Sequence, residues 1–312
     1  MKDQKIEVLS VNISEKKGVV KHAVPEIILD EKGVRTDAHA GSWHRQVSML
    51  AQESIGKFEE KAGRKIKFGE FAENITTKGM ELFHAKPFDR FVNESLELEV
   101  TQIGKKCHGD NCAIFREVGN CVMPKEGIFV RVLRGGELKA GIEFEYIPKV
   151  FKIRVITLSD RASSGEYEDR SGPRITDLVE AYFQKINWRC EIENILIPDD
   201  PKKLAALLDD ACSKKVDIVF TTGGTGIGPK DFTPEVVKSY LDMEIPGIME
   251  LIRMKYGQEK PNAILSRGVA GVMNETLVYA IPGSVKAVVE YMNEITSTLQ
   301  HLIFMLHALD VH

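Results

Sequence analysis

The spacing of apolar residues changes near Pro148, and this change divides the chain into two halves of different fold class. Before Pro148, runs such as KIEVLSVNIS, SLELEVTQIG and GIFVRVLRGG alternate apolar with polar residues, as half-buried antiparallel strands do. After it, the short apolar runs IRVITLS, CEIENILI, VDIVFTT and TLVYAI alternate with segments of helical period, which is typical of βαβ units and a parallel sheet. The sequence therefore predicts a β-rich domain over residues 1–148 and an α/β domain over residues 149–312.

The length and composition agree with two globular domains. A chain of 312 residues is long for a single core and short for three. No stretch approaches the ~18 consecutive apolar residues that a membrane helix needs. The first residues, MKDQKIEVLS, alternate polar with apolar side chains, which predicts a first strand and not an export signal. We therefore expect a cytoplasmic protein without membrane segments.

Neither half carries the basic excess that is expected of a nucleic-acid-binding protein. Residues 1–150 contain 24 Lys and Arg against 23 Asp and Glu, and residues 151–312 contain 18 against 23. We therefore expect no nucleic-acid partner.

The five cysteines are an odd number in a chain without an export signal, which argues against a framework of disulfides. Three of them, Cys107, Cys112 and Cys121, lie close together in the sequence. Their separations do not form the paired knuckles of a structural zinc site, although zinc ligation together with His108 is one interpretation. The other interpretations are burial as small apolar side chains and an exposed thiolate activated by flanking cations.

The segment TTGGTGIGPKDFTPE, residues 221–235, joins a predicted strand to a helix that begins near Thr233. Such loops lie at the carboxyl edge of a parallel sheet, where ligands bind. Its glycines let backbone N–H groups approach an anion, and the helix dipole favours negative charge there. The segment is not a P-loop, because Asp231 follows Lys230, and Pro229 breaks the dinucleotide fingerprint. Taken alone, the segment is explained equally well as a phosphate-binding loop and as a tight connection that binds no ligand.

Acidic residues follow two other strands at the same edge of the predicted sheet. The first strand leads into the long polar loop SDRASSGEYEDRSGP, and the second leads into IPDDP, so that Asp160 and Asp199 join Asp231. Each acid alone is explained as a helix cap or a solvated loop end. Together, these acids lie beside helix N-termini that would bind a phosphate. Their negative charges repel the phosphate unless a hard cation lies between the carboxylates and the phosphate. The combination therefore predicts Mg²⁺ held by carboxylate and phosphate oxygens.

The motifs TLSDRASSG, IPDD, TTGGTGIGPKDFTPE, IPGIMELIR, LSRGVAG and LVYAIPGS resemble, in order and spacing, the MogA/MoaB family of molybdenum-cofactor synthesis proteins. The resemblance covers residues 152–312. It implies a three-layer α/β fold with a mostly parallel sheet, a homo-oligomer that is usually a trimer, and binding of molybdopterin. Active members adenylylate this pterin with MgATP, and some members lack activity.

The resemblance also implies which residues form the site. The essential acids of the family match Asp199 and Asp231, which would hold Mg²⁺. The terminal phosphate of the pterin would attack the α-phosphorus of ATP, so no side-chain nucleophile is required. The nucleotide and pterin contacts of the family match Ser159, Asp160, Gly223, Gly224, Thr225, Gly226, Ser266, Arg267, Pro282, Gly283 and Ser284.

The run from GEFAENITTKG to GIFVRVLRGG resembles the MOSC domain, and this resemblance covers residues 5–147. It implies a β-rich barrel related to the C-terminal part of molybdenum cofactor sulfurases. In that family a cysteine ahead of the Gly-Ile-Phe strand carries sulfur or ligates the cofactor metal. Here that residue is Cys112 or Cys107, and the sequence NCAIF favours Cys112.

Other candidate pocket residues in this half are Glu73, Asn74, His39 and His44. A structural hydrogen bond would explain either histidine alone. The Gly-Asp pair that usually closes the domain is Gly141-Ile142 here, so the resemblance supports binding of the molybdenum cofactor more firmly than sulfur transfer.

Together, the two halves predict a bifunctional protein of molybdenum cofactor biosynthesis. The second half would adenylylate molybdopterin, and the MOSC half would bind, sulfurate or deliver the cofactor, with a molybdenum enzyme or a sulfur-donor protein as partner. The alternative is a carrier or chaperone that binds the pterin without consuming ATP. A molybdenum-dependent regulator would need a DNA-binding element, and the acidic second half argues against one.

Overall fold

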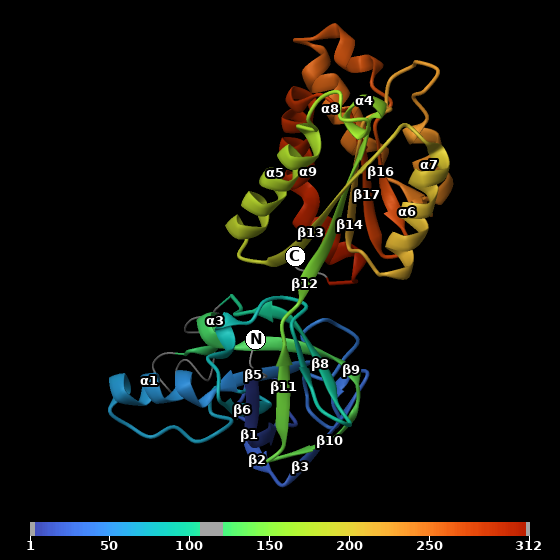
Figure 1. Cartoon of the computed structure of the whole chain (residues 1–312). Coiled ribbons are helices and arrows are strands. Elements are labelled where there is room, and N and C mark those ends of the chain that lie inside the picture. Colours follow the sequence, from blue (N-terminus) through green and yellow to red (C-terminus); the bar gives the residue numbers. More distant parts are fainter. Residues whose placement is uncertain (1–3, 107–120, 310–312) are drawn as a thin grey trace. The chain divides into compact units, whose positions relative to one another are not determined.

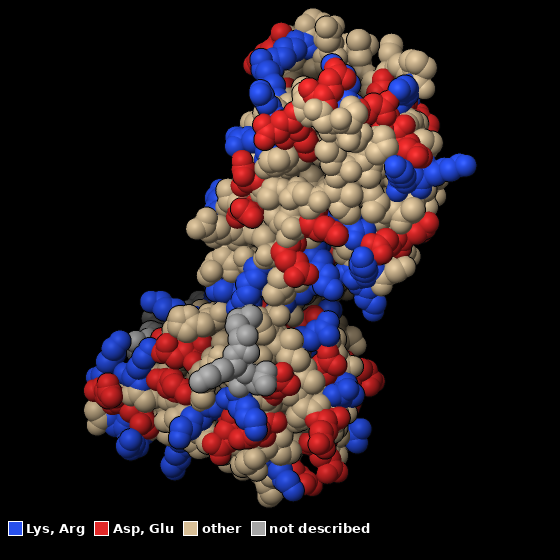
Figure 2. Space-filling model, in the orientation of Figure 1, with Lys and Arg blue, Asp and Glu red and all other residues tan. Residues whose placement is uncertain are grey.

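The computed structural model describes residues 4–106 and 121–309 (Figure 1). The chain divides into two compact units. The N-terminal unit runs to Lys149 and includes the C-terminal residues from His307, and the C-terminal unit is Val150–Leu306. Acidic and basic side chains are interspersed on the face of each unit that Figure 2 shows. Among the described residues, no helix combines the length and apolar character needed to cross a membrane.

A closed barrel of seven strands forms the N-terminal unit, as the MOSC resemblance implied. Pairing between the first and last strands closes the sheet, which leaves the barrel without an open edge. Around the barrel the strands are β1 (Gln4–Ile13), β11 (Glu143–Ile147), β7 (Arg90–Val92), β8 (Glu97–Ile103), β9 (Ile128–Arg134), β5 (Val47–Ala51) and β6 (Ile75–Lys78). Their inward side chains, among them Ile6, Met49 and Phe144, form the fully buried core.

One pair of barrel strands departs from the predicted antiparallel arrangement. Strands β5 and β6 are parallel, because the helix α1 (Gln52–Ala62) crosses between them. The helix packs Ile55 and Phe58 on a smaller core that includes Phe71. Short elements complete the unit: β2 (His22–Val24), β3 (Glu26–Asp30), β4 (Gly33–Val34), η1 (Leu82–His84), α3 (Met123–Glu126) and β10 (Gly136–Lys139).

The C-terminal unit contains a sheet of six strands. In order they are β13 (Arg189–Ile197), β12 (Val150–Leu158), β14 (Ile218–Thr222), β17 (Thr276–Ile281), β16 (Val269–Met273) and β15 (Met243–Glu244). The first four are parallel to one another, β16 is antiparallel to β17, and β15 is antiparallel to β16. The parallel strands are the four apolar runs of the sequence. Their carboxyl ends therefore meet at one edge of the sheet.

Helices cover both faces of this sheet (Figure 1). On one face lie α5 (Ser171–Lys185) and α9 (Val285–Leu306), and on the other lie α6 (Pro201–Ser213) and α7 (Thr233–Tyr240). Leu204, Leu208 and Val237 of α6 and α7 pack on buried strand residues such as Val219 and Val278. The remaining elements are α4 (Asp160–Ser163), α8 (Pro246–Gly257) and η3 (Pro261–Leu265).

Candidate functional site

Two loops meet at the carboxyl edge of the C-terminal sheet. The glycine loop, residues 223–232, joins β14 to α7, and the Pro282–Ser284 turn joins β17 to α9. They adjoin because β14 and β17 are paired, with Thr222 opposite Ile281. The hydroxyl of Thr222 donates to the carbonyl of Pro282 at 3.0 Å, and the N–H of Gly223 donates to the carbonyl of Ile281 at 3.1 Å. The two loops therefore form one continuous surface.

Two positions in the glycine loop require glycine. Gly223 has φ +107°, and a Cβ atom there would lie 2.3 Å from the carbonyl oxygen of Leu158. Gly224 has φ +62°, and its Cβ would lie 2.5 Å from Oγ1 of Thr233. Both conformations disfavour any side chain. In the described part of the chain, the N–H groups of Gly224, Thr225 and Gly226 donate no hydrogen bond, so they are available to an anion.

A pocket of about 520 Å³, here called the glycine-loop pocket, lies over these two loops. Of the residues that the sequence assigned to nucleotide, pterin or metal, the pocket is lined by Gly223, Gly224, Thr225, Gly226, Asp231, Ser266, Pro282, Gly283 and Ser284. Ser159, Asp160, Asp199 and Arg267 do not line it.

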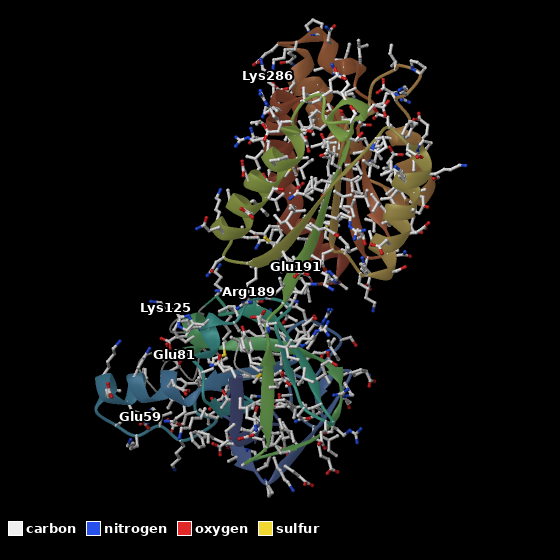
Figure 3. All side chains as sticks on the ribbon, in the orientation of Figure 1. Glu59, Glu81, Lys125, Arg189, Glu191 and Lys286 are labelled. Carbon is white, nitrogen blue, oxygen red and sulfur yellow. The ribbon has the colours of Figure 1, made fainter. Side chains whose placement is uncertain are left out.

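The rim of this pocket, formed by the segment from α8 to η3 and by α9, was not predicted from the sequence. Lys260 and Glu290 form an ion pair there, and Lys286 lies one turn before Glu290 on α9 (Figure 3). The hydroxyl of Tyr291 donates to Oγ of Ser266 at 2.8 Å, and burial raises the pKa of Tyr291, so the phenol stays protonated. In the sequence, Lys286 and Glu290 are four residues apart, which is the spacing of neighbours on one face of a helix.

Arg267 holds the glycine loop in place. Its Nε donates to the carbonyl of Gly226 at 2.6 Å, and its Nη2 donates to the carbonyl of Asp231 at 2.5 Å. It also forms an ion pair with Glu235 of α7. The guanidinium therefore connects both ends of the loop with the following helix.

Asp160 and Asp199 lie side by side at the ends of β12 and β13. The N–H of Asp160 donates to Oδ2 of Asp199 at 3.1 Å, and the N–H of Asp199 donates to Oδ1 of Asp160 at 3.0 Å. Lys230 of the glycine loop pairs with Asp160, and this hydrogen bond lowers the pKa of Asp160. Ser159 accepts from the N–H of Ala162 and so caps α4. The structure thus connects the ends of two strands with the glycine loop.

Asp199 and Asp231 each keep one carboxylate oxygen without a hydrogen bond among the described residues. Oδ2 of Asp231 accepts from the N–H of Gly228 at 2.7 Å, and Oδ2 of Asp199 accepts from Asp160. Within the described residues, Oδ1 of each acid accepts no hydrogen bond, and no group of three or more metal-ligating side chains is present. Mg²⁺ in nucleotide sites commonly takes one or two protein carboxylates and completes its shell with phosphate and water. Two open carboxylate oxygens fit that pattern.

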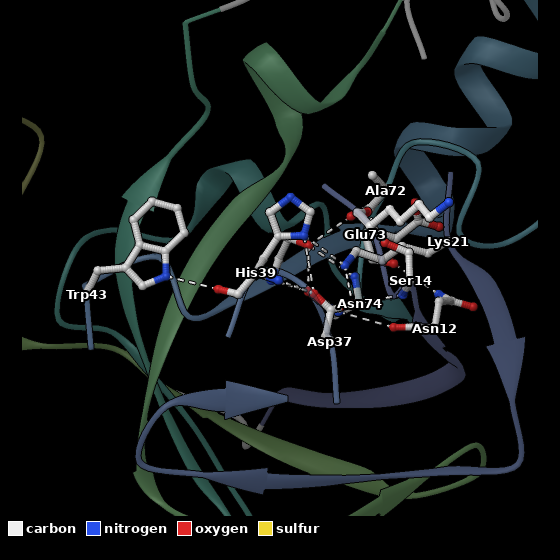
Figure 4. Close-up of polar contacts among 11 residues, drawn as sticks. Asn12, Ser14, Lys21, Asp37, His39, Trp43, Ala72, Glu73 and Asn74 are labelled. Atoms are coloured by element: carbon white, nitrogen blue, oxygen red, sulfur yellow. Dashed lines mark hydrogen bonds and ion pairs between the residues drawn. The ribbon is translucent and has the colours of Figure 1, made fainter. Parts of the chain in front are cut away.

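In the N-terminal unit, five residues form what we call the polar cluster: Lys21, Asp37, His39, Glu73 and Asn74 (Figure 4). Oδ2 of Asp37 accepts from Nζ of Lys21 at 2.5 Å and from Nδ2 of Asn74 at 3.2 Å. Oδ1 of Asn74 accepts in turn from Oγ of Ser48 at 3.0 Å. Asn74 and Glu73 are both buried. Asn74 donates to the carboxylate of Asp37, and Glu73 accepts from the backbone N–H of Gly69.

Glu73 is fully buried. Its Oε1 accepts from the N–H of Gly69 at 2.6 Å and from the hydroxyl of Thr76 at 3.1 Å. Oε2 has no hydrogen-bond partner within the part of the chain that the structure describes. Burial raises the pKa of Glu73 to about 7, because a buried carboxylate loses its hydration.

The other sequence candidates in this unit divide into two groups. Cys107, Cys112 and His108 lie outside the described residues. Cys121 is a half-buried thiol, and Nε2 of His44 contacts Oε1 of Gln102 at 3.1 Å. Sequence analysis missed Lys21 and Asp37, because no motif connects them and only the folded barrel brings them together.

Two known domain families match the chain. Residues 154–301 match the family described as a probable molybdopterin binding domain, and residues 36–145 match the MOSC domain.

Individual proteins resemble about half of the chain. The molybdopterin adenylyltransferase of Pyrococcus furiosus is 35% identical over 161 residues, which are 50% of this chain and 91% of that protein. Gephyrin of Dictyostelium discoideum is 33% identical over 162 residues, and the match spans only 22% of its length. The crystal structure of the molybdopterin biosynthesis enzyme MoaB from Thermus thermophilus is 33% identical and covers 51% of this chain and 98% of its own, with a TM-score of 0.46. The chain therefore belongs to the MogA/MoaB family of molybdopterin-binding proteins, and it carries a MOSC domain ahead of that family's domain.

Proposed function

We propose that the C-terminal unit adenylylates molybdopterin with MgATP, and that the MOSC domain binds, sulfurates or delivers the resulting cofactor. In the adenylylation, an oxygen of the pterin's terminal phosphate forms a bond to the α-phosphorus of ATP. The bond between the α-phosphorus and the bridging oxygen breaks, and pyrophosphate leaves. The observation that carries the proposal is the glycine-loop pocket, where three unused backbone N–H groups lie beside Asp231, whose Oδ1 accepts no hydrogen bond among the described residues.

The pocket supports this reaction by positioning and by charge. The N–H groups of Gly224, Thr225 and Gly226 bind phosphate oxygens, and the N-terminus of α9 adds its dipole. Arg267 keeps the loop in its binding conformation through the two carbonyls that it contacts. Holding two anionic reactants in line removes much of the entropic barrier. Asp199 and Asp231 would hold Mg²⁺, which supplies positive charge for the phosphates.

Pyrophosphate release from ATP and molybdopterin tests the proposed reaction. In Asp231→Asn, the amide oxygen keeps the bond to the N–H of Gly228 while the charge is lost, so the loop is preserved. We expect Asp199→Asn and Asp231→Asn each to lower the rate about 100-fold or more. Asp200→Asn is the matched control: Asp200 caps α6 through Lys202 and Lys203, and asparagine caps equally well, so the rate should not change.

Equal release by wild type and both variants would overturn the mechanism. Binding of pterin by the wild type without any pyrophosphate release would identify the chain as the non-catalytic carrier or chaperone.

We also propose that the C-terminal unit forms a homo-oligomer, with a trimer as the expected state. Exposed apolar side chains on two adjacent elements support this proposal: Leu251 and Met254 of α8, and Ile264 and Leu265 of η3. Large exposed apolar patches of this kind commonly mark protein interfaces. Sedimentation equilibrium of wild type and of Met254→Glu measures the state, and a wild-type monomer would exclude the trimer.

A further inference from the structure

His39 is oriented by Asp37 so that one nitrogen of its ring faces away from the polar cluster. Oδ1 of Asp37 contacts Nδ1 of His39 at 3.2 Å and accepts from the N–H of the same residue at 2.9 Å. Nε1 of Trp43 donates to the carbonyl of His39 at 3.1 Å, which fixes the backbone. The side chain of His39 is 32% exposed, and in the described structure its Nε2 has no hydrogen-bond partner (Figure 4).

The surroundings of Asp37 decide which nitrogen of His39 carries the proton. Asp37 is almost fully buried, and burial alone would raise its pKa, but the hydrogen bonds from His39 and Lys21 outweigh burial and lower the pKa. Asp37 also accepts from Nζ of Lys21 and from the N–H groups of Ser14 and His39, which favours the carboxylate whatever the tautomer of His39. A carboxylate can only accept, so Nδ1 of His39 donates to it. Nζ of Lys21 lies 3.4 Å from Nδ1 but has a closer acceptor in Asp37 at 2.5 Å. Nε2 therefore carries a free lone pair.

Arg45 lies near Trp43, whose indole contacts His39, and both Arg45 and Lys105 lie near Phe129. The guanidinium of Arg45 lies 4.8 Å from the ring centre of Trp43 and 5.8 Å from that of Phe129. Nζ of Lys105 lies 6.0 Å from the ring centre of Phe129. Burial lowers the pKa of Lys21, and the charge of Lys105 acts in the same direction. Nε of Arg45 is buried and has no hydrogen-bond partner among the described residues. A cavity of about 530 Å³ borders Trp43 and Arg45.

We propose that Nε2 of His39 removes the proton from a thiol bound beside Trp43, and that Arg45 and Lys105 stabilise the resulting thiolate. The S–H bond breaks, the proton forms an N–H bond to Nε2, and the electron pair stays on sulfur, so no oxidant or reductant is needed. A thiol is the matching acid: its pKa of about 8.5 is close to that of an imidazole, whereas an aliphatic hydroxyl is too weak an acid and a carboxylic acid is already ionised.

The inference deepens the proposed function of the MOSC domain, because the dithiol of molybdopterin is a thiol of this class. Only the identity of the natural thiol depends on the proposed function of the MOSC domain. The geometry of Asp37 and His39 does not depend on whether the C-terminal unit turns over ATP. Asp37 acts here as a positioning residue, and His39 is the residue that contacts the thiol.

The first test is the tautomer of His39 in the full-length protein. Long-range ¹H–¹⁵N NMR spectra of histidine-labelled protein at pH 8 distinguish the two neutral forms, and His39→Gln assigns the signal among the eight histidines. We expect the form with the proton on Nδ1. A proton on Nε2 in the wild type would overturn the proposal, and this result needs no variant of Asp37, which could fail to fold.

The second test uses ethane-1,2-dithiol as the probe, because its alkyl thiols are mostly protonated at pH 7, and thiolate ultraviolet absorbance as the signal, without ATP. We expect the wild type to increase the bound thiolate at pH 7 roughly tenfold over free probe, equivalent to about one pKa unit. His39→Gln should abolish the increase. His44→Gln is the matched control, because His44 borders the cavity beside Trp43 and Arg45 but its Nε2 already contacts Gln102. No increase with the wild type, or an equal increase with His39→Gln, would overturn the proposal.

Discussion

Each unit of this protein contains a lysine–aspartate ion pair, but the two pairs differ in their exposure to water. In the N-terminal unit, the side chains of Lys21 and Asp37 are each 1% exposed. In the C-terminal unit, the side chains of Lys230 and Asp160 are 73% and 40% exposed. The buried pair is enclosed by further hydrogen bonds from the barrel, whereas the exposed pair lies beside the acid Asp199 at the carboxyl edge of the sheet.

The same two residue types, lysine and aspartate, therefore play different roles in the two units. A buried ion cannot regain water if its partner is removed, so the Lys21–Asp37 pair is tied to the fold of the barrel. An exposed ion pair contributes little to stability, because water and salt screen it. Lys230 can therefore exchange Asp160 for another anion without unfolding the domain.

The largest effect is expected when the lysine of each pair is replaced. Lys21→Met leaves Asp37 buried without its cation and should lower the free energy of unfolding of the N-terminal unit by about 3–5 kcal/mol. Lys230→Met should not change stability measurably. Urea unfolding in a Trp188→Phe background, where Trp43 reports on the barrel, measures the first effect, and circular dichroism measures the second. Equal losses of stability in the two variants would contradict the claim that the buried pair stabilises its unit and the exposed pair does not.

A smaller effect is expected from the buried acid Glu73. Its pKa is raised from 4.5 to about 7, so folding favours the protonated form. The stabilisation is complete below about pH 4.5 and is lost as the pH rises through 7, and the difference amounts to about 3 kcal/mol. The barrel should therefore unfold more easily at pH 8 than at pH 5.5.

Glu73→Gln should remove this pH dependence, because an amide does not titrate and can still accept from Gly69 and Thr76. Urea titrations at both pH values compare the two proteins. A wild-type barrel that is equally stable at pH 5.5 and pH 8 would contradict the account of Glu73.

The smallest effect on stability is expected in the glycine loop. Gly223→Ala forces a side chain into a left-handed conformation and against Leu158, at a cost of about 1–3 kcal/mol. Its main result should be weaker binding of ATP, measured by calorimetry, because the loop must shift. Gly247→Ala is the control, since no atom lies within 4 Å of its Cβ position. Unchanged ATP affinity in Gly223→Ala would show that the loop does not hold the nucleotide.

Local patterns made much of the fold and part of the site predictable. The apolar runs correspond to β12, β13, β14 and β17. The inner strands β12, β14 and β17 are buried and therefore need apolar side chains on both faces, whereas in the edge strand β13 only Ile197 is buried. The glycine loop was recognisable because its glycines and Asp231 are close in the sequence. The antiparallel strands β15 and β16 gave no such signal, because one is only two residues long and the other contains a glycine.

Contacts between distant residues were not predictable from the sequence. Asp37 joins Lys21, Asn74 and His39 only after the barrel closes, and Lys260 joins Glu290 only after α9 packs beside α8. Asn74 was expected to line a pocket, and the structure places it inside, as a support for Asp37. A short motif identifies residue types, but long-range packing decides whether a side chain faces a ligand or the core.

The most direct test of the central claim follows the α-phosphate of ATP. The full-length protein is incubated with molybdopterin, Mg²⁺ and ATP labelled at the α-phosphate, and the label is located after separation of the products. Our account predicts labelled pterin in amounts equal to the pyrophosphate released. Pterin that binds to the protein but remains unlabelled would contradict it.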